Sequence, residues 1–330
     1  MELKPDAGAG SVPAGGEPAV RVREATVRRV DFGSVALFDD AGGTLEAMVR
    51  GRVMGRRKAL GNAVVVGDRV TLEWEADRAA IDAVAPRRTA FSRRASGERV
   101  EEQVVAANLD LVVIVASLHR PDFKHGLVDR VLAQALGAGL PAVLVLNKTD
   151  LGNADETAEL LADYGPAGVH GIATCGVTGA GVAALREACR GRRSLFVGHS
   201  GVGKSTLLDH LAPGHELLTG DVNETTGKGR HTTTAAVLLR PEPGVELIDT
   251  PGVRAFGLWG IDADNLADHY PEIAPHLGGC RFADCRHDSE PGCGIREARE
   301  RGDIPARRWE SYLRLRDELA EEQRPRYRGR

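Results

Sequence analysis

Residues 194–212, SLFVGHSGVGKSTLLDHLA, combine an apolar strand, a glycine-rich turn and a segment whose apolar residues have helical spacing. Within them, residues 198–205 fit the phosphate-binding pattern G-x-x-x-x-G-K-[ST], and they lie between a strand and a helix as that pattern requires. Gly201 and Gly203 would let backbone N–H groups turn toward phosphate oxygens, and Lys204 would add a point charge. A chance glycine-rich turn is the alternative, which the flanking strand and helix disfavour. The stretch therefore predicts a nucleotide-binding α/β fold.

Two downstream elements would complete the phosphate end of the site. In VELIDTPG, residues 245–252, Asp249 ends an apolar strand and would hold Mg²⁺ through water, while the N–H of Gly252 would meet the γ-phosphate. In the loop GKGRHTTTA, residues 227–235, a threonine would close over Mg²⁺ as a first switch. The magnesium ligands expected are Ser205, Thr232, Thr233 and Asp249. The nucleotide contacts expected from the glycine-rich loop are Gly198, His199, Ser200, Gly201, Val202, Gly203, Lys204, Ser205 and Thr206, with Lys204 also catalytic.

The tetrapeptide NKTD, Asn147 to Asp150, follows an apolar run and would read the base of the nucleotide. The Asp150 carboxylate can accept two hydrogen bonds from guanine N1–H and the exocyclic amine, a pair that adenine does not offer. Asn147 can bond the base or tie loops together, and both uses remain open. An NKTD turn that only caps a helix is the alternative. We predict that GTP contacts Asn147, Lys148, Thr149 and Asp150, with a weaker match for Thr174 and Cys175 in a second base-side loop.

The base-reading motif precedes the phosphate-binding loop in this chain, which inverts the usual order. All of these motifs are expected on loops at the carboxyl ends of parallel strands, so their positions in space depend on the sheet and not on which strand comes first. The segment GVAALREAC, residues 181–189, would be the helix that joins the base-reading half to the phosphate-loop strand. The sequence therefore predicts a circularly permuted GTPase domain.

The region before the GTPase motifs has a different pattern. Residues 1–19 are rich in Gly, Ala and Pro and are expected to be a disordered tail. Five short β-like runs over residues 20–95 suit a small barrel of the oligonucleotide-binding (OB) type. Fifteen basic and ten acidic residues lie between Arg21 and Arg94, in a chain whose net charge is -4. A basic barrel of this kind would bind an RNA backbone, although a solvated barrel surface is the alternative.

Three of the five cysteines lie close to a histidine near the C-terminus. The spacing C-x4-C-x-H-x5-C comprises Cys280, Cys285, His287 and Cys293. Three thiolates and one imidazole suit tetrahedral Zn²⁺ with no open position, so we expect one structural zinc ion and not a catalytic one. Three buried cysteines beside an unrelated histidine are the alternative. Neither a signal peptide nor an apolar run long enough to span a bilayer is present, so a cytoplasmic protein without membrane contact is expected.

The order NKTD, GHSGVGKST, GRHTTT, DTPGVRAF and CRFADCRHDSEPGC, after an OB-like barrel, resembles the RsgA/YjeQ family of ribosome small-subunit-dependent GTPases. The resemblance covers about residues 20 to 320. It implies GTP hydrolysis to GDP and phosphate, stimulated by the small ribosomal subunit during its late maturation. It also implies contact with ribosomal RNA through the barrel and the zinc-binding domain.

The residue after DTPG is Val253, at a position where many GTPases carry the glutamine that orients the attacking water. An aliphatic side chain cannot do this, so slow intrinsic turnover is expected. His231 in the first switch is our candidate for the missing polar group, and a structural loop residue is the alternative.

The expected organisation is a tail at 1–19, a barrel at 20–95, a permuted GTPase domain at 96–258 and a mostly helical zinc-binding domain at 259–330, in a monomer. Two other function classes compete with this one. A small-molecule kinase would share the phosphate loop but has no use for NKTD. An RNA-binding protein with a vestigial nucleotide site would bind RNA equally in all nucleotide states.

Overall fold

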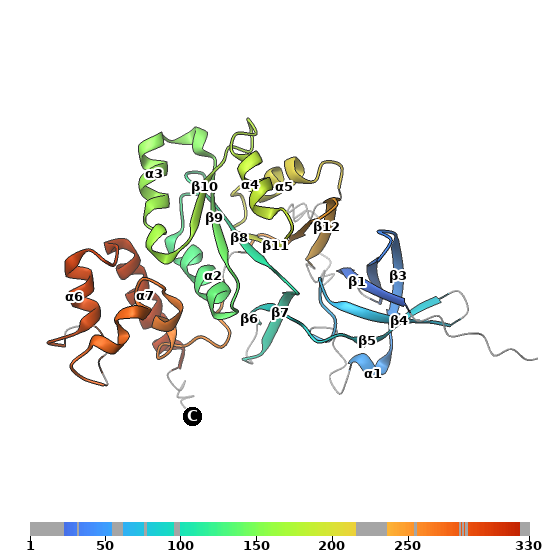
Figure 1. Ribbon diagram of the computed structural model, residues 1–330, viewed down its shortest axis with the longest axis horizontal. Helices are drawn as coiled ribbons and strands as arrows, with labels where there is room; N and C mark the ends of the chain where they lie inside the picture. The colour runs from blue at the N-terminus through green and yellow to red at the C-terminus, as the bar shows by residue number, and fades with distance from the viewer. Residues whose placement is uncertain are drawn as a thin grey trace, which may run out of the picture.

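The computed structural model describes residues 23–31, 33–54, 62–75, 78–95, 100–215, 236–253, 256–283, 285, 287 and 290–323. These residues form a β-barrel, a central α/β sheet and a helical C-terminal part, which follow one another along the chain (Figure 1). The expected tail at 1–19, the final basic residues and the candidate residues His231, Thr232 and Thr233 lie outside the described residues. None of the helices described is long and apolar enough to cross a membrane.

The N-terminal region forms the predicted barrel. Its strands are β1 (Arg23–Val30), β2 (Val35–Asp39), β3 (Thr44–Val49), β4 (Arg69–Glu75) and β5 (Arg78–Val84), with the short helix α1 (Gly51–Met54) after β3. Antiparallel pairing of β1 with β4 and parallel pairing of β3 with β5 close the sheet. Alternating strand residues point inward, and Val27, Leu37, Leu72 and Ile81 are fully buried in the barrel core. The five-stranded barrel inferred from the sequence is confirmed.

A separate hairpin lies between the barrel and the main sheet. It consists of β6 (Ala90–Arg94) and β7 (Glu102–Ala107), which pair with each other in a two-stranded sheet. Phe91 is fully buried, and its ring centroid lies 5.6 Å from that of Phe256. The sequence predicts no hairpin here, and the expected domain boundary at residue 95 lies one residue after the end of β6.

The central sheet has the strand order β10-β9-β8-β11-β13-β12. The first five strands are parallel and β12 is antiparallel to β13. Their bounds are β8 (Leu111–Ser117), β9 (Ala142–Asn147), β10 (His170–Ala173), β11 (Arg193–Gly198), β12 (Val237–Glu242) and β13 (Val245–Asp249). The strands β8, β9, β11 and β13 coincide with apolar runs of the sequence, whereas β10 and β12 are not predicted from it. These two are the outer strands of this part of the sheet, where the apolar runs are short.

Helices cover both faces of this sheet because its strands are apolar on both sides. Along β8, Val112 and Ile114 face the core cluster that includes helix α2, and Val113 and Val115 face the cluster that includes α4 and α5. The helices are α2 (His125–Gly137), α3 (Ala154–Ala162), α4 (Val182–Cys189) and α5 (Lys204–Leu211). Helix α4 links β10 at the edge to β11 in the centre, as the predicted permutation requires.

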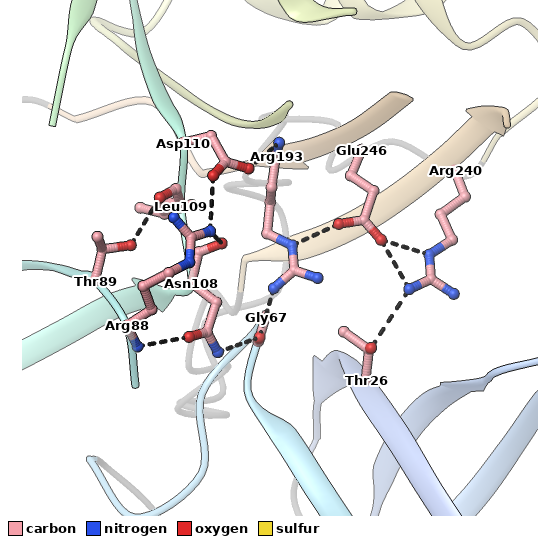
Figure 2. Close-up of polar contacts among 10 residues, drawn as sticks. All are labelled: Thr26, Gly67, Arg88, Thr89, Asn108, Leu109, Asp110, Arg193, Arg240 and Glu246. Atoms are coloured by element: carbon pink, nitrogen blue, oxygen red, sulfur yellow. Dashed lines mark hydrogen bonds and ion pairs between the residues drawn. The ribbon is translucent and has the colours of Figure 1, made fainter. Parts of the chain in front are cut away.

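The barrel joins the central sheet directly, since Arg29 of β1 pairs with Val237 of β12. A polar network supports this junction (Figure 2). Arg193 Nε donates to Glu246 at 2.6 Å and its Nη1 donates to the Gly67 carbonyl at 2.7 Å, while Arg240 Nε donates to the other Glu246 oxygen at 2.8 Å. Burial tends to raise the pKa of Glu246, but the two guanidinium groups prevail and hold it below its usual range.

The Gly67 turn of the barrel lies tightly against the end of β7. Gly67 has φ +88, and a Cβ atom there would lie 2.2 Å from the Ala107 carbonyl oxygen. The Ala107 N–H also donates to the Val66 carbonyl at 2.9 Å, and Asn108 Nδ2 donates to the Gly67 carbonyl at 3.0 Å (Figure 2). The barrel and the β6–β7 hairpin therefore share backbone contacts, and glycine is required at the closest approach.

The C-terminal part contains the 3₁₀ turns η3 (Leu266–His269) and η4 (Ala274–Gly279) and the helices α6 (Gly294–Arg301) and α7 (Ala306–Gln323). It packs on α2 through a buried ionic cluster. Arg308 donates to Glu272 at 2.6 Å and also to Asp129 of α2, and all three side chains are buried. The Arg308 guanidinium lies 4.7 Å from the Tyr270 ring centroid, which adds a cation–π contact. This pairing fixes the C-terminal part to α2 of the central domain.

Candidate nucleotide and metal sites

The glycine-rich loop lies at the carboxyl end of β11 and leads into α5, which begins at Lys204. Gly201 and Gly203 have φ angles of +86 and +89, which L-residues with side chains rarely adopt. A Cβ atom on Gly203 would also lie 2.3 Å from Asn147 Nδ2. Glycine is thus required at position 203 both for its backbone angle and for the close approach of the NKTD loop.

The DTPG segment lies against the glycine-rich loop. Lys204 forms an ion pair with Asp249, and the two side chains are 6% and 0% exposed. The Val253 N–H donates to the Gly198 carbonyl at 3.0 Å, and a Cβ atom on Gly252 would lie 2.9 Å from Ser200 Cα. The sequence motifs at 198–205 and 249–252 therefore meet at one sheet edge, although about fifty residues separate them.

Asn147 ties three loops together. Its Nδ2 donates to the Val202 carbonyl at 2.9 Å, and its Oδ1 accepts from Thr174 Oγ1 at 3.1 Å and from the Gly176 N–H at 3.0 Å. The side chain is 1% exposed. Of the two uses that the sequence left open for Asn147, the structure displays the tying of loops. The NKTD segment, the glycine-rich loop and the loop at Thr174–Gly176 are thereby held together.

Asp150 lies at the outer end of these loops, where it is exposed. The Cys175 thiol donates to Asp150 Oδ1 at 3.1 Å, and Thr149 Oγ1 donates to the Thr174 carbonyl at 3.0 Å. Thr174 and Cys175, which matched a second base-side loop weakly in the sequence, thus lie beside NKTD and form hydrogen bonds with the side chains of Thr149 and Asp150. Lys148 has a left-handed backbone, and its ammonium donates to the Arg120 carbonyl.

One segment next to the site carries no recognised motif. Residues 118–124 follow β8 and run beside the glycine-rich loop, so that a Cβ atom on Gly201 would lie 3.6 Å from Pro121 Cδ. Lys124 Nζ lies 2.9 Å from His199 Nε2. The only sequence signal for this segment is its position after a buried parallel strand, where ligand-binding loops occur.

The four candidate metal ligands come together as expected. The ligand atoms of Cys280, Cys285, His287 and Cys293 all lie within 4.8 Å of one another. His287 Nδ1 lies 3.4 Å from Cys280 Sγ and 3.7 Å from Cys293 Sγ, and the φ angle of His287 is +63. All five cysteines of the chain are free thiols, so no disulfide competes for these sulfur atoms.

The chemistry of this cluster fits a zinc ion. Burial lowers the pKa of His287, which favours the neutral imidazole that a metal binds. Four protein ligands of soft and borderline type leave no vacant position on a tetrahedral ion, which is characteristic of structural zinc. The cluster lies beside α6, whose first residue directly follows Cys293. A bound ion would thus link the loop at 280–287 to the start of a helix.

Comparison with known proteins agrees with this arrangement. Residues 84–259 match the family model described as RsgA GTPase. A protein from Gemmatimonas aurantiaca named "Small ribosomal subunit biogenesis GTPase RsgA" is 44% identical over 287 residues, which cover 86% of this chain and 93% of that protein. A protein of the same name from Hahella chejuensis is 40% identical over 79% of this chain and 75% of its own length.

Two solved structures share the fold over most of the chain. The crystal structure of YjeQ from Thermotoga maritima superposes with a TM-score of 0.73 and 29% identity, covering 91% of this chain and 99% of that one. The structure of YloQ, described as a circularly permuted GTPase, has a TM-score of 0.69 and 23% identity over 93% of this chain and 98% of its own. The likeness to YloQ concerns the fold alone.

Proposed function

The chain belongs to the RsgA GTPase family, and from this premise we propose that it hydrolyses GTP when bound to the small ribosomal subunit during late maturation. As a member it is a GTPase of small ribosomal subunit biogenesis that binds the ribosome. We further propose that the bound nucleotide, GTP or GDP, controls the binding of the protein to the ribosome and its release. The observation that supports the residue assignments most strongly is the Asn147 side chain, which joins the NKTD segment to the glycine-rich loop.

At the base end, the Asp150 carboxylate would accept hydrogen bonds from guanine. The Cys175 thiol donates to its Oδ1 and orients it. At the phosphate end, backbone N–H groups of residues 198–206 and the Lys204 ammonium would surround the phosphate oxygens. Ser205 and Asp249 offer the hydroxyl and carboxylate oxygens that Mg²⁺ prefers, with Thr232 or Thr233 as a further ligand. When bound, Mg²⁺ would supply positive charge that offsets the negative charge of the phosphates.

In the reaction, water attacks the γ-phosphorus, the bond to the β–γ bridging oxygen breaks, and GDP and phosphate leave. The Lys204 ammonium, which pairs with Asp249 in the structure, would turn toward the phosphate oxygens as they enter. Gly252 lies against the glycine-rich loop, because a Cβ atom on it would lie 2.9 Å from Ser200 Cα. Its N–H would donate to the γ-phosphate from this position. The Val253 side chain is only 9% exposed and cannot orient water. Another polar group must complete the site, and intrinsic turnover should be slow.

RNA binding by the barrel and the C-terminal part completes the proposal. Fifteen basic against ten acidic residues from Arg21 to Arg94 favour contact with a phosphate backbone. The Arg281 guanidinium lies 5.5 Å from the centroid of the exposed Phe282 ring, next to the metal ligand Cys280. An exposed aromatic ring beside a cation suits a nucleobase and its phosphate. An RNA-binding protein with a vestigial nucleotide site is the alternative.

The decisive experiment measures GTP turnover by the purified protein with and without purified small subunits. We expect slow turnover alone and an increase of about 10²-fold with subunits, the effect of one added group that stabilises the transition state. ATP should not replace GTP. Equal turnover with and without subunits would contradict the proposal, and subunit binding that is equal with GDP and with a non-hydrolysable GTP analogue would favour the vestigial site.

His231 is proposed as the group that completes the site on the ribosome. We expect His231→Ala to reduce subunit-stimulated turnover by about 10²-fold, a typical loss for a general base or a water-orienting group, and to leave GDP affinity unchanged. His170→Ala is the matched control, because that histidine is exposed on β10. Full stimulated turnover by His231→Ala would remove the residue from the mechanism.

A further inference from the structure

The segment before α2 makes one contact with the phosphate loop that none of the recognised motifs accounts for. Lys124 is the residue immediately before α2, and its carbonyl accepts from the Leu127 and Val128 N–H groups at 3.1 Å. The preceding turn is held by Ser117 Oγ, which donates to the Pro121 carbonyl at 2.5 Å. From this fixed position, Lys124 Nζ reaches His199 Nε2 at 2.9 Å. His199 is the second residue of the glycine-rich loop.

These contacts determine the tautomer of His199. A lysine ammonium is a donor only, so His199 Nε2 must carry a lone pair and accept. His199 Nδ1 lies 2.6 Å from the Ser200 carbonyl oxygen, which is an acceptor only, so Nδ1 must carry the proton. The neutral Nδ1–H form satisfies both partners, and the other neutral tautomer satisfies neither. Lys124 therefore selects the tautomer that can bind the Ser200 carbonyl.

The Ser200 carbonyl belongs to the central peptide of a tight turn. The Val202 N–H donates to the His199 carbonyl at 3.3 Å, and Gly201 has φ +86, which is the signature of a type II turn from 199 to 202. Types I and II differ mainly by rotation of the central peptide through about 180°. In a trans peptide the C=O and N–H groups point in opposite directions. When the Ser200 carbonyl is held by His199, the Gly201 N–H points the other way.

We propose that Lys124 and His199 form a positioning relay that holds the Ser200–Gly201 peptide so that the Gly201 N–H faces the phosphates of bound nucleotide. The inference rests on the proposed function and deepens it. Phosphate loops act through backbone N–H donors that are oriented before the nucleotide arrives. Since Ser200 also contacts Gly252, the relay fixes the donor at the end of the site where the γ-phosphate would be sensed.

The composition of the chain agrees with a specific role for Lys124. Only six of its 43 basic residues are lysine, and three of the six, Lys124, Lys148 and Lys204, lie at the nucleotide edge of the sheet. A compact ammonium can approach a ring nitrogen end-on, whereas a planar guanidinium needs more room. Lys124 is nevertheless exposed, which distinguishes it from the buried Lys204.

Two single variants and their combination test the relay. We expect His199→Ala to lower kcat for GTP hydrolysis by about 10²-fold, the usual loss for one oriented donor, and Lys124→Met to lower it by about tenfold because the active tautomer stays partly populated. KM should change less than kcat. His199→Asn, whose amide N–H can replace Nδ1–H without a tautomer, should retain most activity. In that background Lys124→Met should have no further effect.

A spectroscopic measurement separates orientation from general damage. In ¹⁵N-labelled protein with GDP bound, the Gly201 amide proton should move downfield on nucleotide binding in the wild type and in His199→Asn, but not in His199→Ala. Asp122→Asn is the control, because it changes the charge of the same segment by one unit at a side chain that is 93% exposed. It should match the wild type.

Three outcomes would each refute the relay. The first is wild-type kcat in both His199→Ala and Lys124→Met. The second is a decrease in kcat caused by Lys124→Met that is as large in the His199→Asn background as in the protein with His199. The third is a Gly201 amide proton that moves downfield on GDP binding in His199→Ala as far as it does in the wild type. The amide signature uses GDP and needs no turnover, whereas failure of the proposed GTPase function would appear as absent turnover in the wild type.

Discussion

Replacing Asp150 with Asn should exchange the base specificity of the site. Guanine presents an N1–H and an exocyclic amine to the carboxylate, whereas xanthine carries a carbonyl oxygen in place of the amine, and the Asn amide can donate to that oxygen. A site built to hydrogen-bond a polar group rejects a mismatched partner by roughly 10⁴-fold. We therefore expect the ratio of GTP to xanthosine triphosphate affinity to fall by about 10³- to 10⁴-fold. Competition binding with both nucleotides measures it.

The structure explains why this change should act on specificity and not on folding. Asp150 is exposed, and it accepts from the Cys175 thiol, which can also donate to an amide oxygen. The buried supports of the loop are Asn147 and Thr174, which the substitution does not alter. Asp155→Asn, at an exposed carboxylate in the first turn of α3, is the matched control. An unchanged nucleotide ratio in Asp150→Asn would disprove guanine reading by this residue.

The parts of the fold that could be predicted from sequence depend on short-range patterns. The strands β8, β9, β11 and β13 are continuous apolar runs, because residues on both of their faces are buried by helices. Each run ends in a polar motif, and carboxyl ends of parallel strands meet at one edge. The motif at 198–205 and the NKTD tetrapeptide could therefore be placed together without knowledge of the strand order.

Other features depend on contacts between distant residues and left no local signal. Strand β12 carries Arg240 and Pro241 within a short run and is recognisable only through its pairing with β13 and β1. The ion pair between Arg308 and Asp129 joins residues that are 179 positions apart. The contact between Lys124 and His199 spans 75 positions. Side chains of these types are usually solvated, so nothing in the sequence marks them as partners.

Asn147 combines a feature that the local sequence predicts with one that depends on distant residues. Its position after a strand indicated a nucleotide loop, but its amide could serve either the base or the protein. The choice depends on where the Val202 carbonyl and the Gly176 N–H lie, and these come from two other loops. The buried amide oxygen also accepts from Thr174 Oγ1, and a side chain held by three hydrogen bonds is costly to disturb. The same geometry explains why Gly203 tolerates no side chain.

Loss of one candidate metal ligand should destabilise the C-terminal part and leave the central sheet folded. Cys285→Ser removes one of four ligands, and structural zinc contributes about 10–16 kcal/mol to the folding of small zinc-binding peptides. We expect no stoichiometric zinc in this variant, measured by atomic absorption, and rapid proteolysis of residues 280–293. Intrinsic GTP turnover should remain, because Arg308 and Asp129 hold α7 on the GTPase sheet independently of the cluster. Subunit-stimulated turnover should be lost.

The matched control for the zinc prediction is Cys189→Ala. This thiol lies on α4 in the opposite core cluster, and burial raises its pKa to about 11, so it stays protonated and binds no metal. The control should keep one zinc ion per chain and full stimulation by subunits. If Cys285→Ser kept both, the cluster would be an ordinary group of thiols. If it lost intrinsic turnover as well, the C-terminal part would support the GTPase sheet through the metal, and the buried ionic contact between Arg308 and Asp129 would not suffice to hold the two together.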